Sequence, residues 1–274
     1  MNKQQRLGGI LATLGAILGI GGTFIVFFNW YERALTAEAA EPGCEILLKY
    51  LFPALSDLGI VAGVLYAVSA YGFFTAARWA FPVVVVANVL ALQGSWFINV
   101  PMMAADLPPV FFPIFWPNVI LFFLFMRVVG KVPWSRTILG FVTGMAFVFT
   151  LMNGVASWSR ILTIGTPLYT LVQRAHWISM IGFGVITVGI LLRPKEWMRV
   201  VGMAAALLEL VVGIPLAIAT TVDLGRFSLF SLAPIFSLLL LGIFVWPNLW
   251  QRLTDPEVQI PAEPIEDKPK VQTA

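Results

Sequence analysis

A single carboxyl group in the middle of an apolar segment is the side chain of this sequence best suited to chemistry. The chain has fourteen acidic residues, and only Glu209 falls near the centre of a long apolar run. Helical spacing places it on one face with mostly small residues, including Gly202, Ala206 and Gly213. A charge at the centre of a bilayer costs at least about 2.5–3.5 kcal/mol, so we expect this carboxyl to face other helices.

Two interpretations of Glu209 remain open. Pro215 lies shortly after it and disrupts the backbone hydrogen bonding of the same helix. A carboxyl beside such a kink could bind a cation, a proton or the hydroxyl group of a substrate. The alternative is a protonated, hydrogen-bonded glutamate that only supports the structure.

Polar residues also recur at helical spacing in two other apolar segments. The first stripe consists of Asn88, Ser95 and Asn99, and the second consists of Thr143, Thr150, Asn153 and Ser157. One interpretation is that they form interhelical hydrogen bonds, each worth about 0.6 kcal/mol in a membrane. The other is that they line a shared cavity. On the second interpretation, the predicted substrate- or ion-binding residues are Glu209, Asn88, Ser95, Asn99, Thr150 and Asn153.

The chain has one histidine and one cysteine. We predict that His176 begins a helix on the outer side and lies at the membrane interface, with ligand binding as the alternative. One histidine cannot supply paired haem ligands or a multi-histidine metal site, and Cys44 alone cannot form an intramolecular disulfide. The P-loop, GxSxG and HExxH motifs are missing from the sequence. We therefore expect no cofactor, no metal and no enzymatic activity.

The composition predicts the solvent in which these residues lie. Hydrophobic residues make up 59% of the 274 residues, and charged residues only 11%, against about a quarter in soluble domains. So few charges are typical of a chain surrounded by lipid. The net charge of +3 comes without a basic run, which gives no indication of a nucleic-acid partner.

We predict an all-α, polytopic transmembrane bundle of about eight spans, since that many segments are long enough to cross a bilayer. The expected spans are Leu7–Phe28, Leu58–Ala77, Ala80–Val100, Pro109–Met126, Thr137–Trp158, His176–Leu192, Met198–Thr221 and Phe227–Trp246. The fourth contains three prolines and is either a broken helix or a short helix after an interfacial turn. Asn29–Asp57 is expected to be an outer loop in which Cys44–Phe52 lies along the membrane surface. No internal repeat is convincing.

The distribution of basic residues predicts the orientation. Placing the N-terminus in the cytoplasm puts twelve of the seventeen lysines and arginines on that side and five outside, as the positive-inside rule requires. Both termini are then cytoplasmic, in a membrane of the bacterial plasma (inner) type. Residues 1–253 form the helical bundle, and residues 254–274 are rich in proline and charge, which predicts a short disordered tail.

Glycines mark a packing face on the first span. Gly15 and Gly19 form a GxxxG pattern, and Gly59 and Gly63 form another in the second span. Such small residues let helix backbones approach closely in lipid. Close packing within the chain is one interpretation, and a homo-oligomer through Gly15 and Gly19 is the other.

Two functions compete at this level. The first is a small-molecule or ion transporter or permease, with a midplane cavity near Glu209. The second is a non-catalytic membrane subunit or scaffold, for example of a respiratory complex, whose partners would be other membrane subunits. An intramembrane enzyme is less well supported, because the sequence offers no nucleophile and base at a recognisable spacing.

Overall fold

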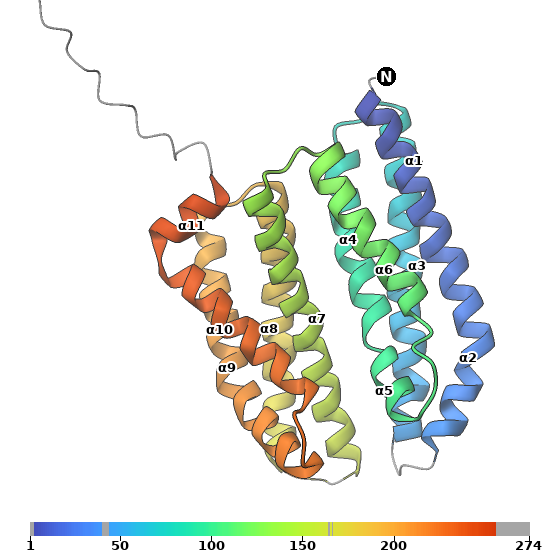
Figure 1. Cartoon of the computed structure of the whole chain (residues 1–274), viewed down its shortest axis with the longest axis vertical. Helices are drawn as coiled ribbons and strands as arrows, with labels where there is room; N and C mark the ends of the chain where they lie inside the picture. Colours follow the sequence, from blue (N-terminus) through green and yellow to red (C-terminus); the bar gives the residue numbers. More distant parts are fainter. Residues whose placement is uncertain (1–2, 40–43, 164, 166, 256–274) are drawn as a thin grey trace, which may run out of the picture.

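The computed structural model describes residues 3–39, 44–163, 165 and 167–255, and these residues form helices and connecting turns without any strand. The predicted all-α fold is therefore confirmed. The long helices form two groups that stand side by side (Figure 1). We call them the N-terminal bundle, Lys3 to Val129, and the C-terminal bundle, Trp134 to Thr254.

The N-terminal bundle is a ring of four antiparallel helical segments. Its elements are α1 (Lys3–Ile17), η1 (Leu18–Gly22), α2 (Thr23–Glu38), α3 (Cys44–Phe74), α4 (Ala80–Trp96), α5 (Asn99–Ala104), α6 (Phe112–Leu124) and η2 (Phe125–Val129). The first three elements form one continuous helical segment that packs along α3. α3 packs on α4, α4 on α6, and α6 closes the ring against α1.

The C-terminal bundle repeats this layout. Its elements are α7 (Trp134–Thr163), α8 (Pro167–Leu192), α9 (Glu196–Leu224), η3 (Leu229–Ser231), α10 (Leu232–Val245) and α11 (Pro247–Thr254). α7 packs on α8, α8 on α9, α9 on α10, and α10 closes the ring against α7. The two bundles meet where α4 contacts α7 and α8, and where α3 contacts α7.

Among the described residues, seven helical segments are long and apolar enough to cross a membrane. They match the first seven expected spans, although most are longer than expected. The eighth, Leu229–Val245, passes the same test only together with α11, from which it is bent by 97°. The chain is thus a multi-pass membrane protein, with seven candidate spans in its described part, or eight if the bent pair is one span.

The proline-rich fourth span is a continuous helix from Phe112 onward. Pro109 precedes the helix, and Pro113 lies in its first turn, where a missing backbone N–H costs nothing. Pro117 lies inside the helix. The turn expected before a short helix is present, because residues 107–111 are not helical.

The prediction of a loop over Asn29–Asp57 is wrong. α2 continues to Glu38, and α3 begins at Cys44, so that only the residues around 40–43 lie between two long helices. The predicted surface helix Cys44–Phe52 is instead the start of α3. Aromatic packing explains the extension, because Phe52 contacts Phe27 and Tyr31 of α2 at ring distances of 5.7 Å.

The glycine face of the first span packs against α3 of the same chain. A Cβ atom at Gly19 would lie 2.7 Å from the Cα atom of Gly63, and one at Gly15 would lie 2.8 Å from the ring of Tyr66. Only glycine allows the two backbones to approach this closely. A homo-oligomer through Gly15 and Gly19 would have to displace this contact, and it stays an untested prediction.

The start of α1 and the end of α11 lie at the same end of the molecule (Figure 1). This agrees with an even number of passes, while the side of the membrane on which the termini lie stays a prediction. The predicted disordered tail lies outside the described residues from position 256 onward.

Candidate functional site

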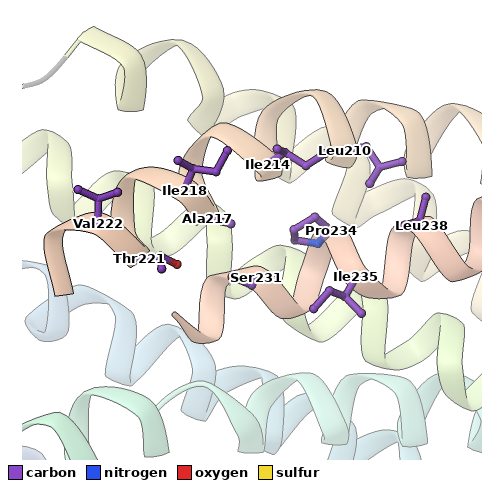
Figure 2. Close-up of a pocket in the computed structure, with 10 residues that line it drawn as sticks. All are labelled: Leu210, Ile214, Ala217, Ile218, Thr221, Val222, Ser231, Pro234, Ile235 and Leu238. Carbon is purple, nitrogen blue, oxygen red and sulfur yellow. The ribbon is translucent and has the colours of Figure 1, made fainter. Parts of the chain in front are cut away.

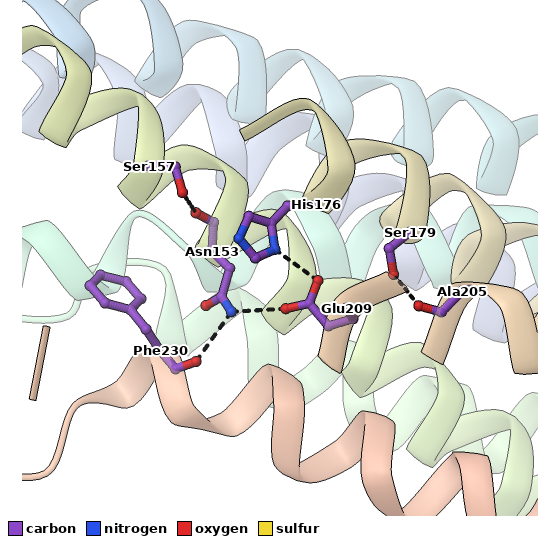
Figure 3. Close-up of polar contacts among 7 residues, drawn as sticks. All are labelled: Asn153, Ser157, His176, Ser179, Ala205, Glu209 and Phe230. Carbon is purple, nitrogen blue, oxygen red and sulfur yellow. Dashed lines mark hydrogen bonds and ion pairs between the residues drawn. The ribbon is translucent and has the colours of Figure 1, made fainter. Parts of the chain in front are cut away.

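Glu209 lies in the interior of the C-terminal bundle, as its position in the sequence predicts. Its side chain on α9 is completely buried, and both carboxyl oxygens have partners from other helices (Figure 3). Oε2 lies 2.8 Å from Nδ1 of His176 on α8, and Oε1 accepts a hydrogen bond of 2.9 Å from Nδ2 of Asn153 on α7. The carboxyl therefore joins three of the four long helices of its bundle.

The interfacial position predicted for His176 is wrong. α8 begins at Pro167, nine residues earlier than expected, so His176 lies well inside the helix and is completely buried. The close approach of α7 explains this position, because a Cβ atom at Gly154 would lie 2.2 Å from the ring of Trp177 and 3.4 Å from the Cβ atom of His176. A larger residue at Gly154 would separate the two helices.

Asn153 fixes the position of the carboxyl. Its amide nitrogen donates to Glu209 and also, over 3.1 Å, to the backbone carbonyl of Phe230 in η3, the short helix before α10. These two acceptors determine which end of the amide is the nitrogen. The backbone carbonyl of Asn153 accepts a hydrogen bond of 2.9 Å from Ser157. Asn153 thus connects the carboxyl to η3 as well.

Gly213 provides the space that the carboxyl occupies. One turn after Glu209 on α9, a Cβ atom at this position would lie 2.7 Å from Oε1 of Glu209 and 3.4 Å from Cδ of Pro234. On the other side of the pair, the hydroxyl of Ser179 donates to the backbone carbonyl of Ala205 over 2.8 Å, which holds α8 on α9. The site is therefore closely packed around the carboxyl.

The contact between His176 and Glu209 can hold one or two protons. With one proton the pair is neutral, either as imidazole and carboxylic acid or as imidazolium and carboxylate, and with two it carries one positive charge. Nε2 of His176 has no hydrogen-bond partner among the described residues. The other ion pair described, Glu196 with Arg199, lies at the start of α9 and is partly exposed, whereas both members of the His176–Glu209 pair are completely buried.

The structure brings only Asn153 of the predicted polar residues into contact with Glu209. Asn88 and Ser95 donate to the backbone one turn earlier in their own helix, over 2.8 Å and 2.6 Å. Asn99 accepts a hydrogen bond of 2.8 Å from the backbone nitrogen of Phe111 and so holds the turn before α6. Thr150 is buried on the same helix as Asn153, and its hydroxyl has no partner in the described part of the chain.

A hollow of about 370 Å³ lies between α9 and α10 (Figure 2). Its lining is almost wholly apolar, and Ile214, Ile218 and Leu238 in it are exposed on the outside of the bundle. Glu209 does not line this hollow. Pro234 lies between the two, since it lines the hollow and also lies beside Gly213.

No group of three or more histidine, cysteine, aspartate or glutamate side chains suited to a metal ion occurs within the described ranges. His176 and Glu209 are two such residues, and their mutual contact uses one imidazole nitrogen and one carboxyl oxygen.

No family model, curated protein or solved structure matches this chain. The class of the protein therefore comes from its own composition and fold. It is an integral, multi-pass membrane protein with a buried histidine–glutamate pair in its C-terminal bundle.

Proposed function

We propose that this protein is a transporter or permease that couples the movement of a small molecule or ion to a proton bound by the His176–Glu209 pair. The observation that carries the proposal is the complete burial of two ionisable side chains, 2.8 Å apart, within membrane-spanning helices. Ionisable groups at this depth are costly, and in membrane proteins they are typical of proton relays and substrate pathways.

The partners of the pair support binding and release of a proton. The partners described for Glu209 include no lysine or arginine, so its negative charge is balanced among them only when a proton is on the pair. Loss of that proton would leave an unbalanced charge in the bundle. The bundle would have to rearrange to stabilise that charge. Proton release would thereby be coupled to a conformational change, as transport requires.

A second candidate is a non-catalytic subunit or scaffold of a membrane complex. The observation that favours it is the enclosure of Glu209, which is fully buried and lies outside the hollow between α9 and α10. In this case the pair only holds α7, α8 and α9 together. Co-purification after mild solubilisation distinguishes the candidates, because a subunit would be recovered with stable partners.

Transport is tested by placing the purified protein in lipid vesicles that contain a pH-sensitive dye. Solutes are added outside by class: polyols, amino acids, organic cations and organic anions. We expect one class to move protons into vesicles with the wild-type protein. Glu209→Gln keeps the size and hydrogen bonding of the side chain but holds no titratable proton, so we expect proton movement to fall to the level of empty vesicles.

The matched controls are two glycines. Gly213→Ala places a methyl group against Oε1 of Glu209, whereas Gly242→Ala in α10 has nothing within 4 Å. We expect the first substitution to reduce proton movement and the second to leave it unchanged. If no solute class moves protons with the wild-type protein, the transporter proposal is wrong. Transport that Glu209→Gln leaves intact would remove the pair from the mechanism.

A further inference from the structure

Ten buried side-chain polar atoms lack a hydrogen-bond partner among the described residues, and seven of them lie on α4, α7 and α8, three of the helices through which the two bundles meet. Five of these seven are Oε1 of Gln93, Nε1 of Trp96, Oγ1 of Thr150, Oδ1 of Asn153 and Nε2 of His176. We call these five residues the polar seam. Buried polar groups in proteins are nearly always paired with protein, water or a ligand, since an unpaired group costs about 1–3 kcal/mol.

Contacts across the bundle interface join the two seam residues of α4 to neighbours of the seam residues on α7 and α8. Nε2 of Gln93 on α4 lies 3.9 Å from the sulfur of Met180 on α8, and Met180 is one helical turn from His176. The ring of Trp96, one turn from Gln93, lies edge-on against Phe149 at 5.7 Å. Phe149 belongs to α7 and is adjacent to Thr150. The seam thus runs across α4, α7 and α8.

Direction along the helices is consistent with these contacts. α4 and α7 run parallel to one another, and α8 runs antiparallel to both. Going from Gln93 to Trp96 on α4 therefore corresponds to going from Met180 to His176 on α8. The seam ends at the His176–Glu209 pair.

The chemistry of the seam is that of an uncharged ligand. Gln93 and Asn153 offer carbonyl oxygens, because their amide nitrogens already donate to other groups. Trp96 offers a donor, and Thr150 offers a hydroxyl that both donates and accepts. The five residues include no lysine or arginine to balance an anion, and the carboxylate nearby is already bonded to His176 and Asn153.

We propose that the polar seam is a water-accessible binding site for a small uncharged polyol, located between the two bundles and next to the His176–Glu209 pair. Polyol hydroxyls donate and accept, as this mixed set of partners requires. The rings of Trp96 and Phe149 provide the apolar surface that the carbon chain of a polyol can cover. The idea that the polyol is transported rests on the proposed function. The existence of a water-accessible binding site does not.

The single cysteine of the chain allows a direct test. In a Cys44→Ser background, Gln93→Cys places a thiol in the seam. Ala91→Cys is the matched control, because Ala91 lies on the same helix, is equally buried and packs in the apolar core of the N-terminal bundle. Thr150→Cys is a second seam variant that changes the side-chain size very little. Each protein is treated with a small charged thiol reagent in lipid vesicles.

Charged thiol reagents react with a thiolate in water, so we expect labelling at Gln93→Cys and Thr150→Cys to be about tenfold or more faster than at Ala91→Cys. Polyols from glycerol to sorbitol should slow the labelling of the seam variants. Acetate and tetramethylammonium at the same concentration should not.

If both seam variants are labelled no faster than Ala91→Cys, the seam is not accessible to water and the proposal is wrong. Rapid labelling that acetate or tetramethylammonium slows, and polyols do not, would overturn the polyol assignment. Both results are independent of transport, because they need no movement of solute. A wet, polyol-protected seam together with unaltered transport in Glu209→Gln would retain this site and reject the proton-coupling role of the pair.

Discussion

Both bundles completely bury aromatic side chains, among them Phe122 and Phe125 in the N-terminal bundle and Phe183 in the C-terminal bundle, but the C-terminal bundle also completely buries a histidine and a glutamate. Both bundles have the same ring of four antiparallel segments, and both bring helices together at glycines. In the first, the glycines bring backbone against backbone, as at Gly19 and Gly63. In the second, Gly154 and Gly213 make room for the side chains of the polar site.

This difference separates two uses of small residues in a membrane. Close contact between backbones replaces the hydrophobic effect that drives helix association in water, and it needs no polar group. Space beside an ionisable side chain has another consequence, because it allows the carboxyl to reach partners on neighbouring helices. We infer that the N-terminal bundle is a structural support. The proposed proton-binding site belongs to the C-terminal bundle.

The largest expected effect comes from removing one member of the pair. His176→Ala leaves Glu209 buried with Asn153 as its remaining side-chain partner, and breaking a buried pair in this way costs about 3–5 kcal/mol. Unfolding in detergent, followed by loss of helical circular dichroism, measures the effect. The double variant His176→Ala with Glu209→Leu should recover part of the loss, because no unpaired carboxyl remains. A double variant that is as unstable as the sum of the two single variants would argue against a paired site.

Overpacking the glycine contact of the N-terminal bundle should have a smaller effect. Gly19→Val pushes against the backbone of Gly63, and we expect a loss of about 1–3 kcal/mol. Gly21→Val is the control, since nothing lies within 4 Å of its Cβ position. The same unfolding measurement applies to both variants. Equal stability of the two would show that the contact between η1 and α3 is looser than the structure indicates.

The smallest loss of stability is expected when the side-chain hydrogen bond between Tyr66 and Asn118 is removed. The hydroxyl donates to Oδ1 over 3.4 Å, a long distance for such a bond. Tyr66→Phe should therefore cost no more than about 0.6 kcal/mol, the average for an interhelical hydrogen bond in a membrane. A loss as large as that of His176→Ala would remove the contrast between the bundles.

Much of the fold could be predicted from the sequence because apolar segments of spanning length are unambiguous. The errors arose at the ends of helices, where polar residues and prolines interrupt the apolar runs. Lys49 and Pro53 interrupt the apolar pattern before the second span, and α3 nevertheless continues over both, with Phe52 packed against α2. The repeated ring of four segments was not predicted, since it lies in the packing and not in any convincing sequence repeat.

Glu209 was found in the sequence because a carboxyl in an apolar run is rare, but His176 was misplaced. A signal was present: Tyr169, Val172, His176, Ser179 and Phe183 recur at alternating spacings of three and four, and all five are buried. That spacing extends the helix face upstream and places His176 on it. The partner of a buried charge lies on another helix, so the pairing with Glu209 required the three-dimensional structure.

The single histidine makes one measurement decisive for the His176–Glu209 pair. Protein labelled with ¹⁵N-histidine gives imidazole nitrogen signals from His176 alone. We predict that Nδ1 in the wild-type protein shows the signal of a strongly hydrogen-bonded nitrogen and that Glu209→Gln shifts this signal. Identical imidazole signals in the wild-type protein and in Glu209→Gln would contradict a shared proton.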